Sequence, residues 1–406
     1  MLDAICKTIK NDTSKMIDLQ KLLTSIPAVS PESGGRGELK KCEQLEIFLK
    51  NAGFSNLERI DAKDALSDGG VRPNLILTIP GKRAENVWVM AHLDVVPPGD
   101  ISKWQSDPWQ VLEKDGKLFG RGVEDNQQGL VSAVFAAKAF IENKIVPERT
   151  VKLLFIADEE FGSEFGIKFL LKNRSDLFKK SDWIVIPDGG DEKGETIEIA
   201  EKSILWLKIH THGEQCHGSM PQRGKNACLA ASDLAMRLNA LENVFGERDE
   251  LFSPPFSTFQ PTKRESNVDT VNIIPGEDVF YMDCRILPRY PLSVVREKID
   301  ECAKKVEEKF GVKIQIDEIQ HEESPATKED ASVVLALKNA IKKTRGIDAK
   351  CVGIGGGTVG AHFRALGFDA AIWSTLDEMC HQPNEYCKIE NMVLDAQTLA
   401  ALFLEK

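Results

Sequence analysis

The 406-residue chain lacks several features that would place it in a specialised class of protein. It has no run of about eighteen apolar residues and no basic segment followed by an apolar stretch at its start, so neither a spanning helix nor an export signal is expected. It also has no low-complexity tract and no repeat period, which argues against disorder and against a repeat architecture.

Basic residues are fewer than acidic ones. The chain has 52 lysines and arginines against 63 aspartates and glutamates, a formal net charge of −11. This balance repels nucleic-acid phosphates and anionic lipid headgroups, so neither nucleic acid nor a membrane is expected as a partner. A small anionic substrate remains open, because local arginines and bound cations decide the potential inside a cleft.

Paired cysteines are also missing. The nine cysteines are an odd number without a paired spacing, which is typical of reduced thiols rather than of a disulfide framework. We therefore expect a cytoplasmic protein.

The pattern that is present is that of an α/β protein. Its length favours two domains. Helical periodicity covers about 11–52, where Pro27 ends the first helix. Strand-like and helical runs then alternate, with strands at 74–79, 86–91, 151–157 and 182–186 and helices at 129–143 and 164–172. This alternation predicts a mostly parallel sheet covered by helices.

The pattern changes between about 203 and 320. There the order is strand, helix, two strands, helix and strand, at 204–212, 227–241, 268–273, 278–286, 292–310 and 313–319. This β-α-β-β-α-β order is that of a ferredoxin-like domain with its own core. We predict an inserted domain at 202–320 within a catalytic domain formed by 1–201 and 321–406.

Residues of the types that bind metal ions follow the predicted strands, where open α/β sheets place their ligands. They are His92, Asp125, Glu159, Glu160, Asp188 and His381. Singly, His92 is equally explained as a core histidine, Asp125 as a helix cap and Asp188 as a turn former. The adjacent pair Glu159 and Glu160 is more informative, because two neighbouring carboxylates after a buried strand repel each other unless a cation compensates them.

Four segments together resemble a known enzyme family. They are 92–97 (HLDVVP), 120–126 (GRGVEDN), 158–163 (DEEFGS) and 381–385 (HQPNE). Their order and spacing are similar to those of the zinc peptidases and deacylases, which include succinyl-diaminopimelate desuccinylase, acetylornithine deacetylase, aminoacylase, dipeptidases and glutamate carboxypeptidase. The resemblance covers nearly the whole chain and implies a catalytic domain of the zinc-exopeptidase type with an inserted lid or dimerisation domain.

The resemblance also implies a role for each ligand. His92 and Asp188 would hold one ion, Glu160 and His381 the other, and Asp125 would bridge both and precede a cis peptide bond. The ions are expected to be zinc, although cobalt or manganese suits the same ligands. Asp94 is similar to the carboxylate that orients the first histidine, and Glu159 to the general base for the attacking water.

Other matched positions would contact the substrate. His217 corresponds to the histidine that stabilises the oxyanion, commonly in a partner subunit, so the resemblance implies a homodimer. Asn272 and Arg285 match substrate-binding positions, and Arg285 could hold a carboxylate with two hydrogen bonds or simply lie on a solvated strand face. The Gly356-Gly357-Thr358 stretch is similar to one that contacts the carboxylate end of the substrate in relatives. For His217 the alternative to an oxyanion role is that of an ordinary loop histidine.

The expected activity is hydrolysis of an amide bond beside a free carboxylate, in an acylated amino acid or a short peptide. A deacylase is one alternative, and a dipeptidase or carboxypeptidase is the other. The sequence does not separate them, because both need the same metals, the same base and an arginine that holds the substrate carboxylate. An inactive relative that only binds is a weaker alternative, since every expected ligand is present. The seven histidines contain no His-Glu-x-x-His motif, and the turn at 353–358 lacks the lysine of a phosphate-binding loop.

Overall fold

The computed structural model describes residues 1–406, and the chain divides into two compact units. Unit 1 comprises Met1–Ile199, Thr327–Cys351 and His362–Lys406, and unit 2 comprises Ala200–Ala326 and Val352–Ala361. The predicted insertion was 202–320. The clearest difference lies at Val352–Ala361, which the prediction left in the catalytic domain and which the structure groups with unit 2.

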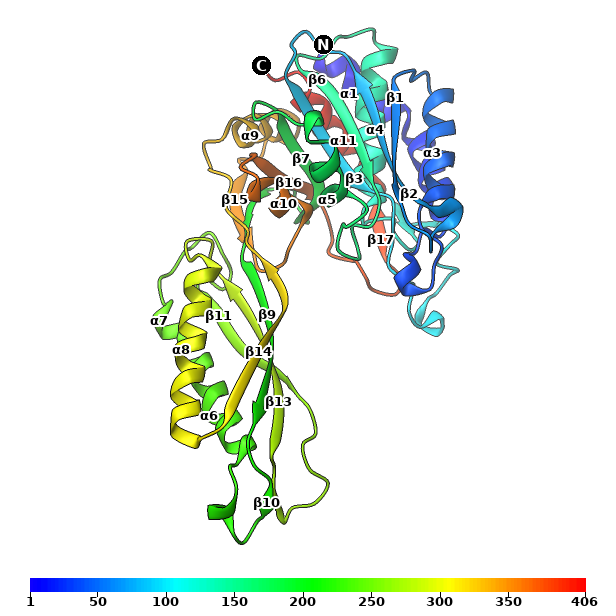
Figure 1. Ribbon diagram of the computed structural model, residues 1–406. Helices are drawn as coiled ribbons and strands as arrows, with labels where there is room; N and C mark the ends of the chain where they lie inside the picture. The colour runs from blue at the N-terminus through cyan, green and yellow to red at the C-terminus, as the bar shows by residue number, and fades with distance from the viewer. The chain divides into compact units, whose positions relative to one another are not determined.

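The core of unit 1 is an eight-stranded sheet with the order β1-β2-β6-β3-β7-β16-β8-β15 (Figure 1). Its strands are β1 (Leu57–Lys63), β2 (Val71–Ile79), β3 (Asn86–His92), β6 (Thr150–Ile156), β7 (Trp183–Asp191), β8 (Thr196–Glu201), β15 (Lys350–Ile354) and β16 (Ala370–Thr375). β3 pairs in parallel with β6 and β7, and β16 pairs in parallel with β7. The mostly parallel sheet predicted from the sequence is therefore present.

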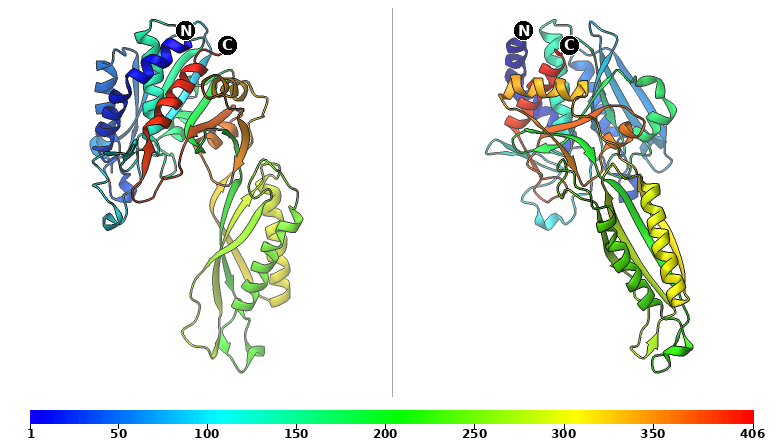
Figure 2. Two further views of the ribbon diagram at one scale, coloured as in Figure 1. Left: turned by 180° about the vertical axis from the view of Figure 1, so that it is seen from behind. Right: turned by 90° about the vertical axis from the view of Figure 1, so that its left-hand side faces the viewer.

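Helices cover this sheet. They are α1 (Leu2–Asn11), α2 (Thr13–Thr24), α3 (Leu39–Asn51), α4 (Gln127–Glu142), α5 (Ile167–Asn173), α9 (Ser332–Arg345), α10 (Val359–Ala365) and α11 (Ile389–Leu402). Figure 2 shows α1, α4 and α11 on one face and α5 on the other. All seven residues of β3 are buried, which is typical of a parallel strand covered on both faces.

α4 lies at the centre of this unit. Fourteen of its sixteen residues are buried, and it contacts β3, β6 and β7 as well as α11. A short three-stranded sheet has β5 (Lys117–Phe119) between β4 (Leu112–Lys114) and β17 (Tyr386–Lys388). Helix α1 begins at Leu2, before the helical periodicity that the sequence shows from about residue 11.

Unit 2 contains a four-stranded antiparallel sheet with the order β11-β13-β9-β14. Its elements are β9 (Ser203–His212), β10 (Cys216–His217), α6 (Ala227–Asn239), α7 (Leu241–Val244), β11 (Thr258–Arg264), β12 (Ile273–Ile274), β13 (Glu277–Ile286), α8 (Leu292–Phe310) and β14 (Lys313–Glu322). Alternate residues of β13 are buried, and α8 buries Leu292, Val295, Ile299, Ala303 and Val306. This core forms between one sheet face and the helices α6 and α8.

One predicted strand of unit 2 was wrong. The structure places the second strand of the predicted order at β11 rather than at 268–273, most of which is an exposed loop that includes fully exposed Val271. β11 contains Pro261 at a bulge, and proline argues against a central strand. β11 lies at the edge of the sheet, where a missing N–H group is tolerated.

Unit 1 also buries charged side chains next to α3. Arg72 donates to the carboxylate of Glu38, with Nε 2.6 Å from Oε2, and both side chains are fully buried. Lys41 is 1% exposed nearby. Burial lowers the pKa of Lys41 to about 8, although the charges of Asp94, Glu38 and Glu385 favour its protonated form.

The lowered pKa of Lys41 predicts a pH-dependent contribution to stability. Between about pH 8 and the ordinary lysine value of about 10.4, the unfolded chain binds the proton that the folded chain has released, so stability rises with pH. The free energy of unfolding of the wild type minus that of Lys41→Met should increase by about 2 kcal/mol from about pH 7.5 to about pH 9.5. Urea unfolding of both proteins measures it, and a difference independent of pH would contradict the burial argument.

Candidate metal centre and active site

The predicted ligands lie where neighbouring parallel strands end. β3 ends at His92, and β6 ends two residues before Asp158, which leads into Glu159 and Glu160. Asp188 lies in the second half of β7. Because β6, β3 and β7 are adjacent in the sheet, these side chains meet at one edge of it.

The first group of ligand atoms belongs to His92, Asp125 and Asp188, and these atoms all lie within 4.8 Å of one another. Nε2 of His92 is 3.0 Å from Oδ1 of Asp125 and 3.8 Å from Oδ1 of Asp188. His92 is only 2% exposed, so its imidazole is held rigidly by the surrounding core.

The second group belongs to Asp125, Glu160 and His381. Nε2 of His381 is 3.1 Å from Oδ2 of Asp125 and 3.0 Å from Oε2 of Glu160. Asp125 therefore directs one carboxylate oxygen to each histidine. The His381 side chain is 55% exposed, and it lies in the loop between β16 and β17.

The electrostatics of this edge fit bound cations. Burial raises the pKa of Glu159 well above its ordinary value, and the charge of Asp188 adds to that effect. Burial also raises the pKa of Asp188 to about 7. These carboxylates resist ionising together unless positive charge lies between them. Imidazole nitrogens and carboxylate oxygens are the donors that zinc and similar divalent ions bind.

Asp94 connects the first histidine with the segment of the predicted base. Nδ1 of His92 is 3.0 Å from the backbone oxygen of Asp94 and 3.5 Å from its carboxylate. The carboxylate of Asp94 accepts the backbone N–H groups of Glu159, at 3.1 Å, and of Glu160, at 3.0 Å. A proton on Nδ1 leaves Nε2 of His92 directed at Asp125 and available to a metal.

Asn126 is a site residue that the sequence analysis did not identify. Its side-chain oxygen accepts the backbone N–H of His92 at 3.1 Å, and its amide nitrogen donates to Oδ1 of Asp188 at 2.9 Å. Asn126 thereby holds two ligands of the first group. The cis peptide bond implied between Asp125 and Asn126 is present.

The predicted oxyanion residue lies in unit 2. Nδ1 of His217 accepts the backbone N–H of Ser219 at 3.1 Å and lies 2.8 Å from its hydroxyl. β10 pairs with β12, and the backbone oxygen of Asn272 accepts the N–H of Gly218 at 2.7 Å. The structure thus brings His217 and Asn272 together. An accepting Nδ1 leaves the proton on Nε2, which can donate outward.

Two other predicted substrate contacts of unit 2 already have partners. Nε and Nη2 of Arg285 donate to the carboxylate of Asp283 at 2.7 and 3.1 Å, while Nη1 donates to the backbone oxygen of Gly355 at 3.0 Å. The hydroxyl of Thr358 donates to the carboxylate of Glu201 and accepts the N–H of Gly360 at 3.1 Å. Gly356 and Gly357 have no side chains, so they could contact a substrate only through their backbone.

Comparison with known proteins decides the family. The model of peptidase family M20/M25/M40 matches residues 88–405. The chain belongs to this family. It is therefore a metallohydrolase, and the expected family is confirmed.

Relatives of this M20 chain cover nearly its whole length. An uncharacterized metallohydrolase of Methanocaldococcus jannaschii is 41% identical over 94% of this chain and 97% of its own. A succinyl-diaminopimelate desuccinylase of a Nitratiruptor species is 27% identical over 91% of this chain and 94% of its own. Human carnosine dipeptidase 1 has a similar fold, with a TM-score of 0.71, 17% identity and coverage of 100% of this chain and 99% of its own.

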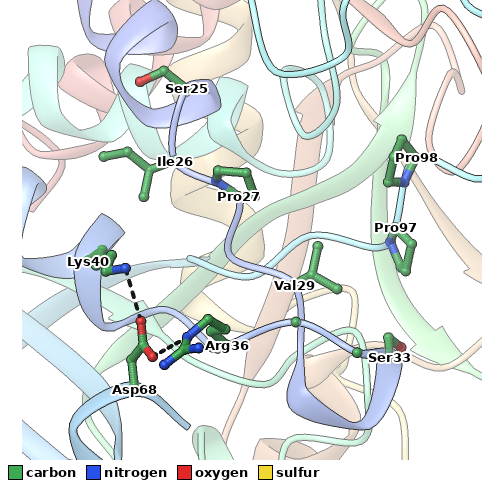
Figure 3. Close-up of a pocket in the computed structure, with 13 residues that line it drawn as sticks. Ser25, Ile26, Pro27, Val29, Ser33, Arg36, Lys40, Asp68, Pro97 and Pro98 are labelled. Atoms are coloured by element: carbon green, nitrogen blue, oxygen red, sulfur yellow. Dashed lines mark hydrogen bonds and ion pairs between the residues drawn. The ribbon is translucent and has the colours of Figure 1, made fainter. Parts of the chain in front are cut away.

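A hollow of about 630 Å³ lies on unit 1, and none of the predicted site residues lines it. Figure 3 shows that Arg36 and Lys40 both point toward Asp68, with which they form ion pairs. Its apolar lining includes Pro97 and Pro98, which follow the His92 segment. Both cations of this hollow are paired with one carboxylate, and its other lining residues are mostly small or apolar, so we assign it no ligand. No helix of this M20 chain is long and apolar enough to cross a membrane.

The contacts of Asp94 predict that it supports metal binding. Asp94→Asn keeps the size but replaces one accepting oxygen by an amide that cannot accept an N–H group of Glu159 or Glu160. We expect the affinity for the metal to fall about 10- to 100-fold. Titration calorimetry on the metal-free protein measures it, with Asp61→Asn on the exposed part of β1 as a control. Unchanged affinity would show that Asp94 does not support the ligands.

Proposed function

We propose that this metallohydrolase binds two divalent ions, zinc or in its place cobalt or manganese, and cleaves an amide bond beside a free carboxylate. Succinylated, acetylated or otherwise acylated amino acids are the proposed substrates. The observation that carries the proposal is the position of Asp125, whose two oxygens face His92 on one side and His381 on the other. A bridging carboxylate between two such groups is what a paired metal site requires.

In this proposal His92 and Asp188 hold one ion, while Glu160 and His381 hold the other. When bound, the ions polarise the carbonyl of the scissile amide and make the attacking water more acidic. Asn126 and Asp94 keep the ligands in place through their backbone contacts. The desuccinylase relatives support an acylated amino acid as substrate, because they match over most of their length.

Glu159 is the proposed general base. It belongs to neither ligand group, and its neighbour Glu160 belongs to the second. Its raised pKa favours retention of a proton after that proton has been taken. Glu159 takes a proton from the water as the water oxygen bonds to the carbonyl carbon, and it then gives this proton to the amine nitrogen as the C–N bond breaks. The products are a carboxylic acid and an amine, the acid then passes its proton to the amine or to solvent, and no covalent bond to the enzyme is formed.

Residues of unit 2 are proposed to bind the substrate. Nε2 of His217 donates a hydrogen bond to the oxygen that becomes negative during attack. Arg285 releases Asp283 and binds the free carboxylate of the substrate in its place. Asn272 also contacts the substrate. As the family resemblance implies, we propose a homodimer in which His217 serves the active site of the partner subunit.

Replacement of Glu159 tests this mechanism. Glu159→Gln removes the base while keeping its size, so kcat should fall by about 10²- to 10⁴-fold. Metal content measured by mass spectrometry should remain at two ions per chain, because Glu159 is not a ligand. Glu164→Gln, an exposed glutamate of the same segment, should leave both quantities unchanged. Retained activity in Glu159→Gln would refute the assigned base, and a fully active wild type with one ion would refute the paired site.

A second candidate, dipeptide hydrolysis, is favoured by the contacts of Thr358. Its single hydroxyl proton is donated to Glu201, so it is not available for a substrate carboxylate. Glu201 is 1% exposed and also accepts the hydroxyl of Ser324 at 2.6 Å. A buried carboxylate at this turn repels the carboxylates of a substrate, and an N-succinyl amino acid carries one more of them than a dipeptide does, so an uncharged or ammonium-bearing acyl group is favoured.

The two candidates predict different substrate preferences. If Glu201 acts through its charge, the wild type should hydrolyse dipeptides with a higher kcat/KM than the matching N-succinyl amino acids. Glu201→Gln should then shift this ratio about tenfold toward the succinyl substrates. Kinetics on a panel that varies only the acyl side measures both. A wild type that prefers succinyl substrates would leave the deacylase proposal in place and reject the dipeptidase.

A further inference from the structure

We propose that Glu124 and Glu385 are positioning residues that hold Asp125 and His381 together and so determine the affinity for the ion of the second ligand group. This inference rests on the proposed two-ion function. It concerns the two loops that carry the bridging ligand and the exposed histidine. Each loop supplies one metal ligand and one carboxylate that belongs to neither ligand group.

The two loops are far apart in the sequence but adjacent in unit 1. Residues 120–126 follow β5 and lead into α4, while residues 376–385 connect β16 with β17. β5 and β17 pair with each other, and Phe119 lies opposite Tyr386. The N–H of Gly120 also donates to the backbone oxygen of Glu385 at 3.0 Å. The short sheet therefore brings the start of one loop to the end of the other.

The carboxylate of Glu385 binds the first loop through four donors. Oε2 accepts Nη1 of Arg121 at 2.6 Å and the N–H of Gly122 at 2.9 Å. Oε1 accepts the N–H of Glu124 at 2.9 Å and the N–H of Asp125 at 3.1 Å. The side chain is completely buried. An ionised carboxylate offers about four acceptor sites and no donor, so these contacts use its full capacity and fix the backbone of the bridging aspartate.

The carboxylate of Glu124 binds the second loop in return. Oε1 accepts the N–H of Asp377 at 2.7 Å, and Oε2 accepts the N–H of Met379. The side chain of Asp377 is held in turn by the hydroxyl of Tyr386 at 2.9 Å and by Nζ of Lys388 at 2.8 Å. Met379 lies two residues before His381. The two loops thus bind each other through reciprocal carboxylates, for which we use the name carboxylate clasp.

The clasp matters more for the second ligand group than for the first. His92 ends a buried strand and Asp188 lies on the neighbouring strand β7, so the sheet itself holds these two ligands. His381 has a positive φ of 62° and an exposed side chain in a loop. Without the clasp, this loop would have to become ordered when the second ion binds, and the cost of ordering would weaken the affinity for that ion.

The test compares metal binding by Glu124→Gln and by the wild type. A glutamine at this position retains one accepting oxygen, but its amide N–H group faces a backbone N–H of the second loop, so two donors oppose each other and one hydrogen bond is lost. Zinc is titrated calorimetrically into the metal-free full chain. We expect two ions to bind the wild type, and in the variant we expect one ion to bind at least tenfold more weakly while the other is unchanged. Glu378→Gln, an exposed glutamate of the same loop, is the matched control and should bind as the wild type does.

A purely structural role would give a different result. If the clasp only stabilises the fold, Glu124→Gln lowers the Tm of the metal-free protein but binds both ions with wild-type affinity, which would overturn the inference. Equal weakening of both ions would also overturn it. A wild type that binds one ion refutes the two-ion function and the inference together. If Glu124→Gln does not fold, Glu124→Asp carries the test, because its shorter carboxylate should weaken the same ion less.

Discussion

Negative charge concentrated at one edge of the parallel sheet is the constraint on which the rest of unit 1 depends. Asp125, Glu159, Glu160 and Asp188 converge there, and burial raises the pKa of Glu159 and of Asp188. Such a group of carboxylates is stable only if positive charge compensates it. Asp125, placed between two histidines, divides the edge into two ligand groups that share one side chain.

The loop segments that carry the ligands are held by backbone N–H groups that donate hydrogen bonds to buried carboxylates. Asp94 accepts the N–H groups of Glu159 and Glu160, and Glu385 accepts those of three residues that end with Asp125. This arrangement suits loops, where no neighbouring strand satisfies the N–H groups. A carboxylate can accept several such groups at once, so a few buried acidic residues order a large part of the site.

Unit 2 carries the residues that we propose to bind the substrate. In its structure Arg285 is paired with Asp283, and Thr358 is hydrogen-bonded to Glu201. Both potential carboxylate-binding groups therefore already face a carboxylate of the chain itself. In the proposed function the two ligand groups and Glu159 carry out the hydrolysis, whereas the choice of substrate depends on such local partners.

The chemistry of the candidate metal ligands and the mostly parallel sheet could be predicted from the sequence, because motifs such as HLDVVP and DEEFGS follow directly on a buried strand and contain ligand residues. The side chains that hold these ligands in place are known only from the tertiary structure. Asn126, the clasp of Glu124 with Glu385 and the bond between Thr358 and Glu201 join residues that no local pattern relates. The edge strand with Pro261 was misplaced for a similar reason, since its tolerance of proline depends on its position in the sheet. Periodicity reports which face of an element is buried, whereas hydrogen-bond partners depend on the path of the whole chain.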